Sequence, residues 1–305
     1  AYPLGADISV IVITYNQKNK ILRCLDSLLQ PEANRLEVVI ADDCSTDGTQ
    51  ETVSGWIREN SRSFANVVFV RNEVNGGTVR NVTSGINASS GKYIKLIAGD
   101  DWFCGEAFET LFGYMAAHSP DVAFSPLLCA RELENGQVEI TGSRMEASKR
   151  ADFFDLSPRE QFNALAVNDV LPAPGSFFSR RFWVAIELEK YPVKFEEDWP
   201  MWVLGTLKEA KFERIEEPLV VYLHHGKSVF QNTASPVFRQ VMRDIATMYR
   251  EIIFPNREKL TIPNLVRAGA NYCLFLLLGT LPLNIVHSLF KLKKKNNRGK
   301  KIQSQ

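Results

Sequence analysis

The chain has 305 residues, 45% of them hydrophobic and 23% charged, and its 36 basic residues nearly balance 35 acidic ones. This is enough for one large α/β domain or two small ones with a real core. The balance hides an asymmetry: residues 291–301 carry seven basic residues and no acid, so the rest of the chain has a net charge of −6. A mildly acidic body with a basic tail argues against a nucleic-acid-binding protein, whose positive charge should lie across the folded surface.

The cysteines are five in number, widely spaced, and form no Cys-x-x-Cys pair. This pattern argues against a zinc site or a disulfide framework and favours a reducing compartment. The first residues show no charged stretch followed by an apolar one, so we expect no secretory signal.

Apolar runs of strand length alternate with segments of helical periodicity over the first hundred residues. The expected strands are 8–13, 36–41, 66–71 and 93–98, and the expected helices are 19–30, 50–59 and 80–87. Such an alternation predicts a parallel sheet with helices on both faces. Ligands of these sheets bind beyond the carboxyl ends of the strands.

Polar clusters stand at three of these carboxyl ends: Thr14–Asn16, Asp42–Thr46 and Asp100–Asp101. The pair Asp100 and Asp101 is the most informative, because two adjacent carboxylates at the end of a buried strand repel each other unless a cation lies between them. A divalent metal with a preference for oxygen ligands meets that need. The sequence therefore predicts a metal and phosphate site at this edge.

The second half is less regular. A strand is expected over 121–128, a hairpin turn at Asn135–Gly136 with its return strand over 138–141, and a helix start at Ser157–Glu160. A segment rich in proline and glycine, 171–178, ends in aromatic residues. Three acids, Glu196, Glu197 and Asp198, come directly before a short amphipathic helix. A last strand is expected over 219–223 and a helix over 240–253.

Four segments together, Ile8–Asn16, Val39–Thr49, Gly99–Asp101 and Glu197–Asp198, resemble the family 2 inverting glycosyltransferases in their order and spacing. The resemblance covers roughly residues 7–228. It implies an α/β fold of the GT-A type, a Rossmann-like nucleotide-diphospho-sugar transferase with a mostly parallel central sheet. The chain departs from the common pattern at Ala98, where many members have an acid, and at Cys44, where glycine is usual.

The resemblance also implies a nucleotide-sugar site. Tyr15 would pack against the nucleotide base, with Thr14 and Asn16 lining the same pocket. Asp43 matches the acid that accepts a hydrogen bond from the ring N–H of a uracil. Arg80 matches a basic residue that contacts the base or the diphosphate.

For the reacting groups, the resemblance implies that Asp100 holds the ribose or the metal shell and that Asp101 binds Mn²⁺ or Mg²⁺, with His225 as a further metal or phosphate contact. Bound metal stabilises the negative charge of the leaving nucleotide. Asp198 matches the general base that takes a proton from the acceptor hydroxyl, which then attacks the anomeric carbon with inversion.

Each of these residues also has a structural explanation. Acids at 42–47 and 196–198 precede helices, where they cap the N-terminus and interact favourably with the helix dipole. Capping accounts for one acid at a time, however, and does not account for the recurrence of polar clusters at three strand ends. His225 could equally be a surface histidine with no ligand.

Residues 268–290 carry no charge apart from the titratable His287, and the lysine tail follows them. Polar residues, Gly279 and Pro282 interrupt the stretch, which suits helices lying in a membrane interface better than a membrane span. Two helices packed on the catalytic domain with a solvated tail are the alternative. We expect a glycosyltransferase domain over 1–228 (nucleotide half 7–125, acceptor half 126–228), a helical linker over 229–262, and C-terminal apolar helices with a basic tail over 263–305.

The function predicted from the sequence is metal-dependent transfer of a sugar from a nucleotide-sugar donor, expected to be a UDP-sugar, to a hydroxyl of a glycan or a lipid-linked acceptor in surface polysaccharide or lipopolysaccharide synthesis. The expected location is the cytoplasmic face of the inner membrane, with no nucleic-acid partner. Two alternatives stay open at this point: an inactive GT-A domain acting as a membrane-bound scaffold, and a nucleotidyltransferase. The second would need a basic, glycine-rich loop after the first strand, where the chain has Tyr15, Asn16 and Gln17.

Overall fold

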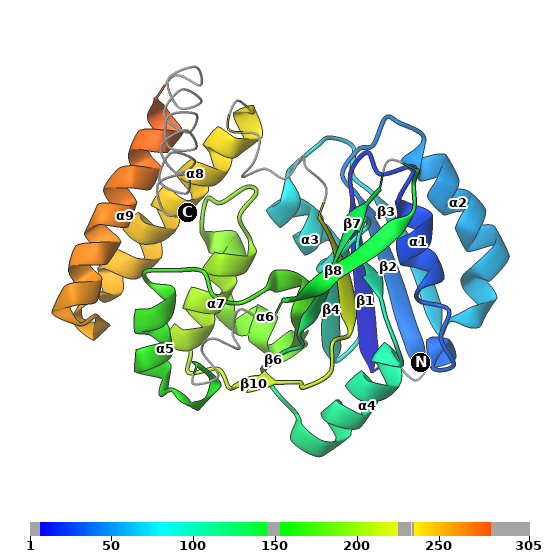
Figure 1. Ribbon diagram of the computed structural model, residues 1–305, viewed down its shortest axis with the longest axis horizontal. Helices are drawn as coiled ribbons and strands as arrows, with labels where there is room; N and C mark the ends of the chain where they lie inside the picture. Colours follow the sequence, from blue (N-terminus) through cyan, green and yellow to red (C-terminus); the bar gives the residue numbers. More distant parts are fainter. Residues whose placement is uncertain (1–6, 134, 145–152, 225–232, 234, 282–305) are drawn as a thin grey trace, which may run out of the picture.

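Two β-sheets and nine α-helices make up the part of the chain that this computed structural model describes, residues 7–133, 135–144, 153–224, 233 and 235–281 (Figure 1). The strands are β1 (Ile8–Thr14), β2 (Leu36–Asp42), β3 (Asn66–Arg71), β4 (Tyr93–Ala98), β5 (Trp102–Phe103), β6 (Val122–Phe124), β7 (Leu127–Glu132), β8 (Val138–Arg144), β9 (Ser176–Ser179), β10 (Phe212–Arg214) and β11 (Val220–His224). The helices are α1 (Ile21–Asp26), α2 (Thr49–Asn60), α3 (Thr78–Asn87), α4 (Ala107–His118), α5 (Pro158–Leu165), α6 (Arg180–Ile186), α7 (Asp198–Leu207), α8 (Pro236–Met248) and α9 (Ile262–Thr280).

The larger sheet has seven strands in the order β10-β6-β9-β4-β1-β2-β3. β1 pairs in parallel with β2 and β4, and β2 with β3, so the predicted parallel sheet is confirmed. Strand β9 is the exception, because it is inserted antiparallel between β4 and β6. The smaller sheet has the order β5-β11-β7-β8, in which β7 and β8 form the predicted hairpin.

The single strand expected over 121–128 is wrong. The structure divides it into β6, in the larger sheet, and β7, in the smaller one. The break falls at Ser125–Pro126, where proline has no N–H group to donate to a sheet. The chain therefore changes sheets at this point.

Alternating side chains of the central strands enter two different cores. Ile11 of β1 lies in a core with α3, α6, α7 and α8, whereas Val10 and Val12 lie in a second core with α1, α2 and α4. This is the period of two expected of a strand that is covered on both faces. The larger sheet is thus buried on both sides, and its carboxyl edge is the part that remains available for a ligand.

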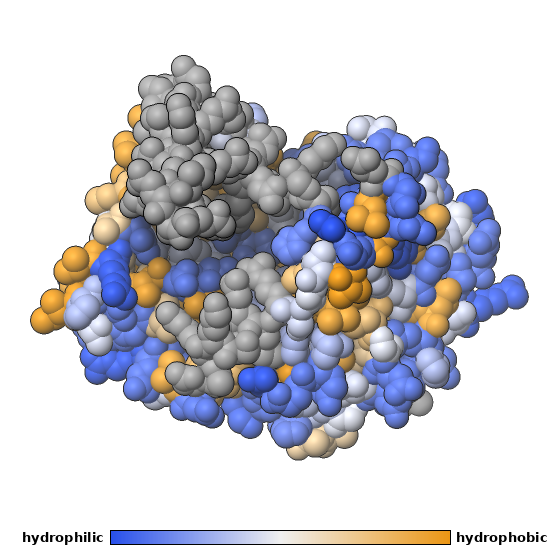
Figure 2. All heavy atoms as spheres, viewed as in Figure 1, coloured by the Kyte–Doolittle hydropathy of each residue, from blue (hydrophilic) through white to orange (hydrophobic). Residues whose placement is uncertain are grey.

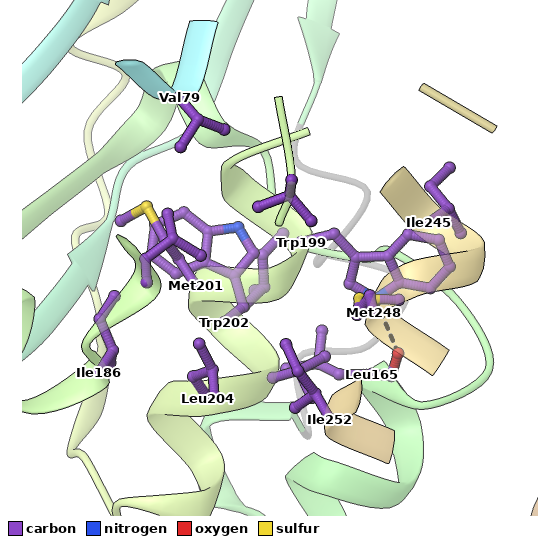
Figure 3. Packing of buried hydrophobic residues seen from close by; sticks show 14 of the residues in the cluster. Val79, Leu165, Ile186, Trp199, Met201, Trp202, Leu204, Ile245, Met248 and Ile252 are labelled. Atoms are coloured by element: carbon purple, nitrogen blue, oxygen red, sulfur yellow. Dashed lines mark hydrogen bonds between the residues drawn. The ribbon is translucent and has the colours of Figure 1, made fainter. Parts of the chain in front are cut away.

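Helices α7, α8 and α9 extend the first core away from the sheet (Figure 1). Figure 3 shows Trp199 and Trp202 of α7 packed among apolar residues that include Ile245 and Met248 of α8. The Trp199 Nε1–H group donates to the carbonyl oxygen of Leu165 at 2.8 Å. Both tryptophans are therefore core residues. Helix α8, which falls in the segment predicted as a linker, belongs to the same core.

Helix α9 packs beside α8 and exposes much of its other face. Its outward apolar residues are Ile262, Leu265, Val266, Leu274, Leu276 and Leu277. Hydrophobic residues accordingly gather along the left edge of the molecule in Figure 2, where Figure 1 places α9. Among the described residues, no helix is both long enough and apolar enough to cross a membrane.

Candidate active site

The pairing of the parallel strands brings the predicted polar clusters to one edge. Thr14 is in register with Asp42, and Ile13 is in register with Ala98. The pattern continues one residue past the strands, where Asp43 N–H donates to Thr14 O at 3.0 Å and Gly99 N–H donates to Ile13 O at 2.9 Å. The ends of β1, β2 and β4 therefore stand side by side, as their sequences predicted.

Gly99 allows the loop after β1 to come close to the end of β4. A Cβ atom at position 99 would lie 2.6 Å from Gln17 Oε1 and 3.3 Å from Thr14 Oγ1. Those two side chains are themselves joined by a hydrogen bond of 2.9 Å, and Thr14 is buried. Thr14 therefore lies directly against the backbone that leads into Asp100.

Asn16 joins the loops that follow β1 and β2. It adopts a left-handed backbone conformation, with φ of 52°. Its N–H group donates to Ser45 Oγ, and its Oδ1 atom accepts from Thr46 N–H, both at 2.8 Å. The neighbouring Tyr15 side chain is 47% exposed, so its ring is accessible at the rim of this edge.

The two acids at the end of β2 make different contacts. Asp43 is buried and accepts backbone N–H groups of Gly76 and Gly77, each at 2.8 Å, which holds the turn before α3. Asp42 Oδ1 accepts from Ser45 and Gln50, while its Oδ2 is buried without a partner among the described residues. A carboxylate oxygen accepts more than one hydrogen bond, so Asp43 can bind both the turn and a ligand N–H.

Arg80, in the first turn of α3, is exposed and packs its side chain over Gly76. It therefore lies next to the turn that Asp43 holds. This places the predicted base contacts Tyr15, Asp43 and Arg80 on strand-end segments of one sheet edge.

Asp101 is buried, and its Oδ1 atom accepts the Leu223 N–H group at 2.9 Å. Burial and the neighbouring charge of Asp100 hold the pKa of Asp101 well above its usual range. Asp100 itself is half-buried. Burial and the charge of Asp100 thus make a negative charge on Asp101 unfavourable, against the smaller opposing effects of Lys95 and Lys20.

These acids fit a metal that takes most of its ligands from elsewhere. Among the described residues, no three His, Cys, Asp or Glu side chains are grouped closely enough to hold a metal ion. Mg²⁺ bound with nucleotides is commonly held by one or two carboxylates, with substrate phosphates and water completing its shell. Asp100 and Asp101 match that donor set. His225 lies outside the described residues, two positions after Leu223.

Lys95, the one charged residue of β4, is fully buried beneath this edge. Its ammonium group donates to the carbonyl oxygens of Pro174 at 2.5 Å and Ser176 at 3.0 Å. Burial lowers the pKa of Lys95 to about 7. Lys95 thereby fastens the proline- and glycine-rich segment to β4. Its signal in the sequence was a lone charge within a buried strand.

Asp198 is the first residue of α7 and lies across from the end of β4. Together with Glu197 it borders a cavity of about 80 Å³, whose wall also includes Ala98, Pro174 and Trp202. The cavity shows that the strand end, the segment held by Lys95 and the predicted base all meet at one place. Ala98, where an acid is common in the family, thus faces the same space as Asp198.

The pKa values of the acids at the start of α7 and just before it are shifted toward the neutral forms. Burial raises the pKa of Asp198, against the effect of its hydrogen bonds with Trp199 N–H and the Glu196 side chain. Burial, and then the charge of Asp198, raises the pKa of Glu197 to about 8. Burial also holds the pKa of Glu196 well above its usual range. A raised pKa makes a carboxylate a stronger base, which suits the removal of a proton from a hydroxyl group.

Comparisons with known proteins agree with this geometry. The family model described as Glycosyl transferase family 2 matches residues 9–157. Glycosyltransferase GlyA of Streptococcus pneumoniae is 31% identical over 116 residues, which are 38% of this chain and 16% of that protein. The poly(ribitol-phosphate) beta-glucosyltransferase of Bacillus spizizenii is 25% identical over 162 residues, 52% of this chain and 25% of that protein. The chain thus spans less than two thirds of the length of these relatives.

Two solved structures share the fold. S. aureus TarS, residues 1–349 with UDP-GlcNAc, has a TM-score of 0.58 and 20% identity, covering 81% of this chain and 67% of that one. The mannosyltransferase PcManGT of Pyrobaculum calidifontis, with GDP-Man and Mn²⁺, has a TM-score of 0.53 and 17% identity, covering 94% of this chain and 80% of that one. The α/β architecture of the GT-A type expected from the sequence is confirmed.

Proposed function

The chain belongs to glycosyl transferase family 2, and from this premise we propose that it transfers a sugar from a nucleotide-sugar to a hydroxyl group of a glycan or lipid-linked acceptor, with inversion at the anomeric carbon. One observation carries the proposal. Asp198, a half-buried carboxylate with a raised pKa, borders the same cavity as the end of β4, two residues before the acid pair.

On the donor side, the nucleotide would lie over the ends of β1 and β2. The exposed ring of Tyr15 would pack against the base, with Thr14 and Asn16 forming the adjoining wall. The N–H groups of Gly76 and Gly77 hold the Asp43 carboxylate in place. The same carboxylate would accept a ring N–H group of the base. Arg80 would bind the base or the diphosphate, and Asp100 the ribose or the metal shell. TarS with UDP-GlcNAc and PcManGT with GDP-Man support a nucleotide-sugar donor, and Asp43 favours a uracil base.

The proposed cofactor is Mn²⁺ or Mg²⁺, held by Asp101 with Asp100 at its edge and His225 as a further contact. Such an ion, when bound, stabilises the negative charge that develops on the leaving diphosphate. The presence of Mn²⁺ in PcManGT supports this assignment. The chain's own part is to hold two carboxylates where their mutual repulsion favours a cation.

In the transfer step, Asp198 would accept the proton of the acceptor hydroxyl as its oxygen attacks the anomeric carbon. The bond from that carbon to the diphosphate oxygen breaks on the opposite side, and the nucleotide leaves with the electron pair. This sequence needs one base and no nucleophilic side chain. The segment that Lys95 holds, Pro174–Ser176, would form the acceptor side of the cavity.

The donor can be identified by thermal shift with UDP-, GDP- and dTDP-sugars, each with and without Mn²⁺. A ligand that binds only the folded state raises the melting temperature, and more so the tighter it binds. We expect the largest shift for a UDP-sugar in the presence of Mn²⁺. If none of the nucleotides shifts the melting temperature, the proposed donor site is wrong.

We further propose that the enzyme works at the cytoplasmic face of a membrane, where surface polysaccharides and lipid-linked glycans are extended. The outward face of α9 is apolar, and Arg267 is the single charged residue of that helix. The basic residues of 291–301 follow in the sequence, each worth about 1 kcal/mol near an anionic membrane surface. This combination of an apolar helix face and adjacent positive charge suits a surface of anionic lipid.

A further inference from the structure

Asp244 of α8 binds the chain immediately before the proposed catalytic base. It is 1% exposed, and its Oδ2 atom accepts three successive backbone N–H groups, from Lys194 at 2.9 Å, Phe195 at 2.6 Å and Glu196 at 3.3 Å. Its Oδ1 atom accepts the Gln240 side-chain amide at 2.8 Å. Hydrogen bonds to an ionised carboxylate are about twice as strong as those between neutral groups. The segment 194–196 is therefore firmly held by one side chain.

This segment connects two parts of the site. On one side it leads directly into Glu197 and Asp198, and the Glu196 side chain is hydrogen-bonded to Asp198. On the other side, Lys194 O accepts the Val79 N–H group of α3 at 3.0 Å. Gly77, whose N–H group binds Asp43, lies so close to Lys194 that a Cβ atom there would be 2.7 Å from Lys194 O.

The buried position of Asp244 is unfavourable for an acid, because other acids lie near it. The charge of Asp244 adds to those of Asp198, Glu197 and Asp169 in raising the pKa of Glu196. Like charges gathered in a buried region cost stability, so three converging N–H groups are needed to keep Asp244 there. An apolar residue would fill this helix face without that cost, since Val241, Met242, Ile245 and Met248 around it are all buried in the core. The carboxylate is thus explained by the segment it holds.

We propose that Asp244 is a positioning residue of this transferase: by fixing segment 194–196 it sets the place of Asp198 opposite the end of β4 and anchors the first turn of α3. The catalytic part of this statement rests on the proposed function. The anchoring of the segment does not. One consequence is that activity depends on α8, which lies beyond the residues 9–157 matched by the family model.

The first test measures amide hydrogen exchange in the full chain, comparing Asp244→Asn with Glu251→Gln. The Asn variant keeps the size of the side chain but removes its charge and turns at least one acceptor into a donor. Glu251 is an exposed acid whose side chain binds its neighbour Arg250 and no other described residue, so its variant controls for a lost charge. We expect exchange at 194–196 and at Val79 to speed up at least tenfold in Asp244→Asn and to stay unchanged in Glu251→Gln. Unchanged exchange in both variants would overturn the anchoring.

The second test measures transfer with the donor that thermal shift identifies, together with the affinity for UDP. A positioning role predicts that Asp244→Asn lowers kcat at least tenfold, with a clearly smaller loss of UDP affinity that arises from the first turn of α3. If kcat is the same as in Glu251→Gln, or if kcat and UDP binding are lost in parallel, Asp244 does not act through Asp198. Should wild-type protein show no transfer at all, the proposed function fails, and the exchange experiment still decides the anchoring.

Gln240→Met provides a milder variant if Asp244→Asn does not fold. It removes the hydrogen bond to Asp244 Oδ1 and leaves the carboxylate in place. We expect a smaller change in the same direction, with exchange at 194–196 faster by about threefold. No change in exchange or in kcat for a folded Gln240→Met, together with an unfolded Asp244→Asn, would assign Asp244 to the stability of the core alone.

Discussion

Asp101 and Leu223 are joined by a hydrogen bond of 2.9 Å from the Leu223 N–H group to the Asp101 carboxylate, which connects the end of β4 to β11. These strands belong to different sheets. One oxygen of Asp101 therefore holds the two sheets together next to the site, while Asp100 beside it is half-buried. Any metal at this edge would be placed relative to both sheets.

The variant Asp101→Asn separates these two roles. Its amide oxygen can still accept the Leu223 N–H group, but the side chain no longer carries a negative charge. We expect the variant to fold. We expect its affinity for UDP in the presence of Mn²⁺ to be at least tenfold lower than that of the wild type. The exposed acid Glu59 supplies the control variant Glu59→Gln. Equal affinity in the two variants, measured by thermal shift over a range of Mn²⁺ concentrations, would remove Asp101 from the metal site.

Gly77 is expected to be sensitive to the smallest substitution. Its φ of 88° disfavours any side chain, and a Cβ atom would lie 2.7 Å from Lys194 O. Gly77→Ala should lower the free energy of unfolding by about 1–3 kcal/mol. Gly113, in the interior of α4, has nothing within 4 Å of its added Cβ, so Gly113→Ala should raise stability by about 0.5–1 kcal/mol. Urea denaturation of both variants checks the contrast. If Gly77→Ala lowers the free energy of unfolding by no more than Gly113→Ala changes it, the close approach of Gly77 to Lys194 is refuted.

The acids before α7 predict a pH dependence. The pKa of Glu197 is raised from 4.5 to about 8 in the folded protein, so the folded state binds this proton more tightly than the unfolded chain. The resulting stability is present below the unfolded pKa of 4.5 and is lost as the pH rises toward 8. The free energy of unfolding should therefore decline between pH 4.5 and about 8. In Glu197→Gln we expect this decline to be smaller by about 1–3 kcal/mol. Parallel curves of unfolding free energy against pH for the two proteins would contradict the shift.

Membrane binding can be tested on the outward face of α9. The double variant Leu276→Glu, Leu277→Glu places charges at residues that are 42% and 50% exposed, so folding should be preserved. We expect at least tenfold weaker co-sedimentation with vesicles of anionic lipid, because apolar burial is lost and the two added negative charges are repelled by the lipid. Val184→Glu, at a residue 67% exposed on α6, is the matched control. If the wild type, the double variant and Val184→Glu co-sediment with the vesicles equally, or if the wild type does not co-sediment at all, α9 does not bind lipid.

The strand ends were the most predictable part of the fold. Strands β3 and β4 have the bounds expected from their apolar runs, and the acids that follow β2 and β4 meet at one edge because parallel pairing leaves no other arrangement. Strand β9 was not foreseen, since its four residues pair with β4 and β6 far away in sequence. Local patterns carry no information about such pairing.

The partners of the site residues were also beyond the sequence. Nothing near Asp43 indicated that it would hold the Gly76–Gly77 turn, and nothing near Asp198 pointed to α8. A signal for Asp244 did exist: it is a lone acid on the apolar face of an amphipathic helix, as Lys95 is a lone charge in a buried strand. Isolated charges of this kind mark buried polar contacts, but the contacts themselves come from tertiary structure.

The central claim is that Asp198 removes the proton of the acceptor hydroxyl, and the most direct test compares transfer and binding in Asp198→Asn. The variant preserves the size of the side chain and loses its basicity. We expect kcat to fall at least a thousandfold while the dissociation constant of UDP with Mn²⁺ stays within threefold of wild type. Transfer at a rate near that of wild type, or loss of UDP binding along with transfer, would contradict the account.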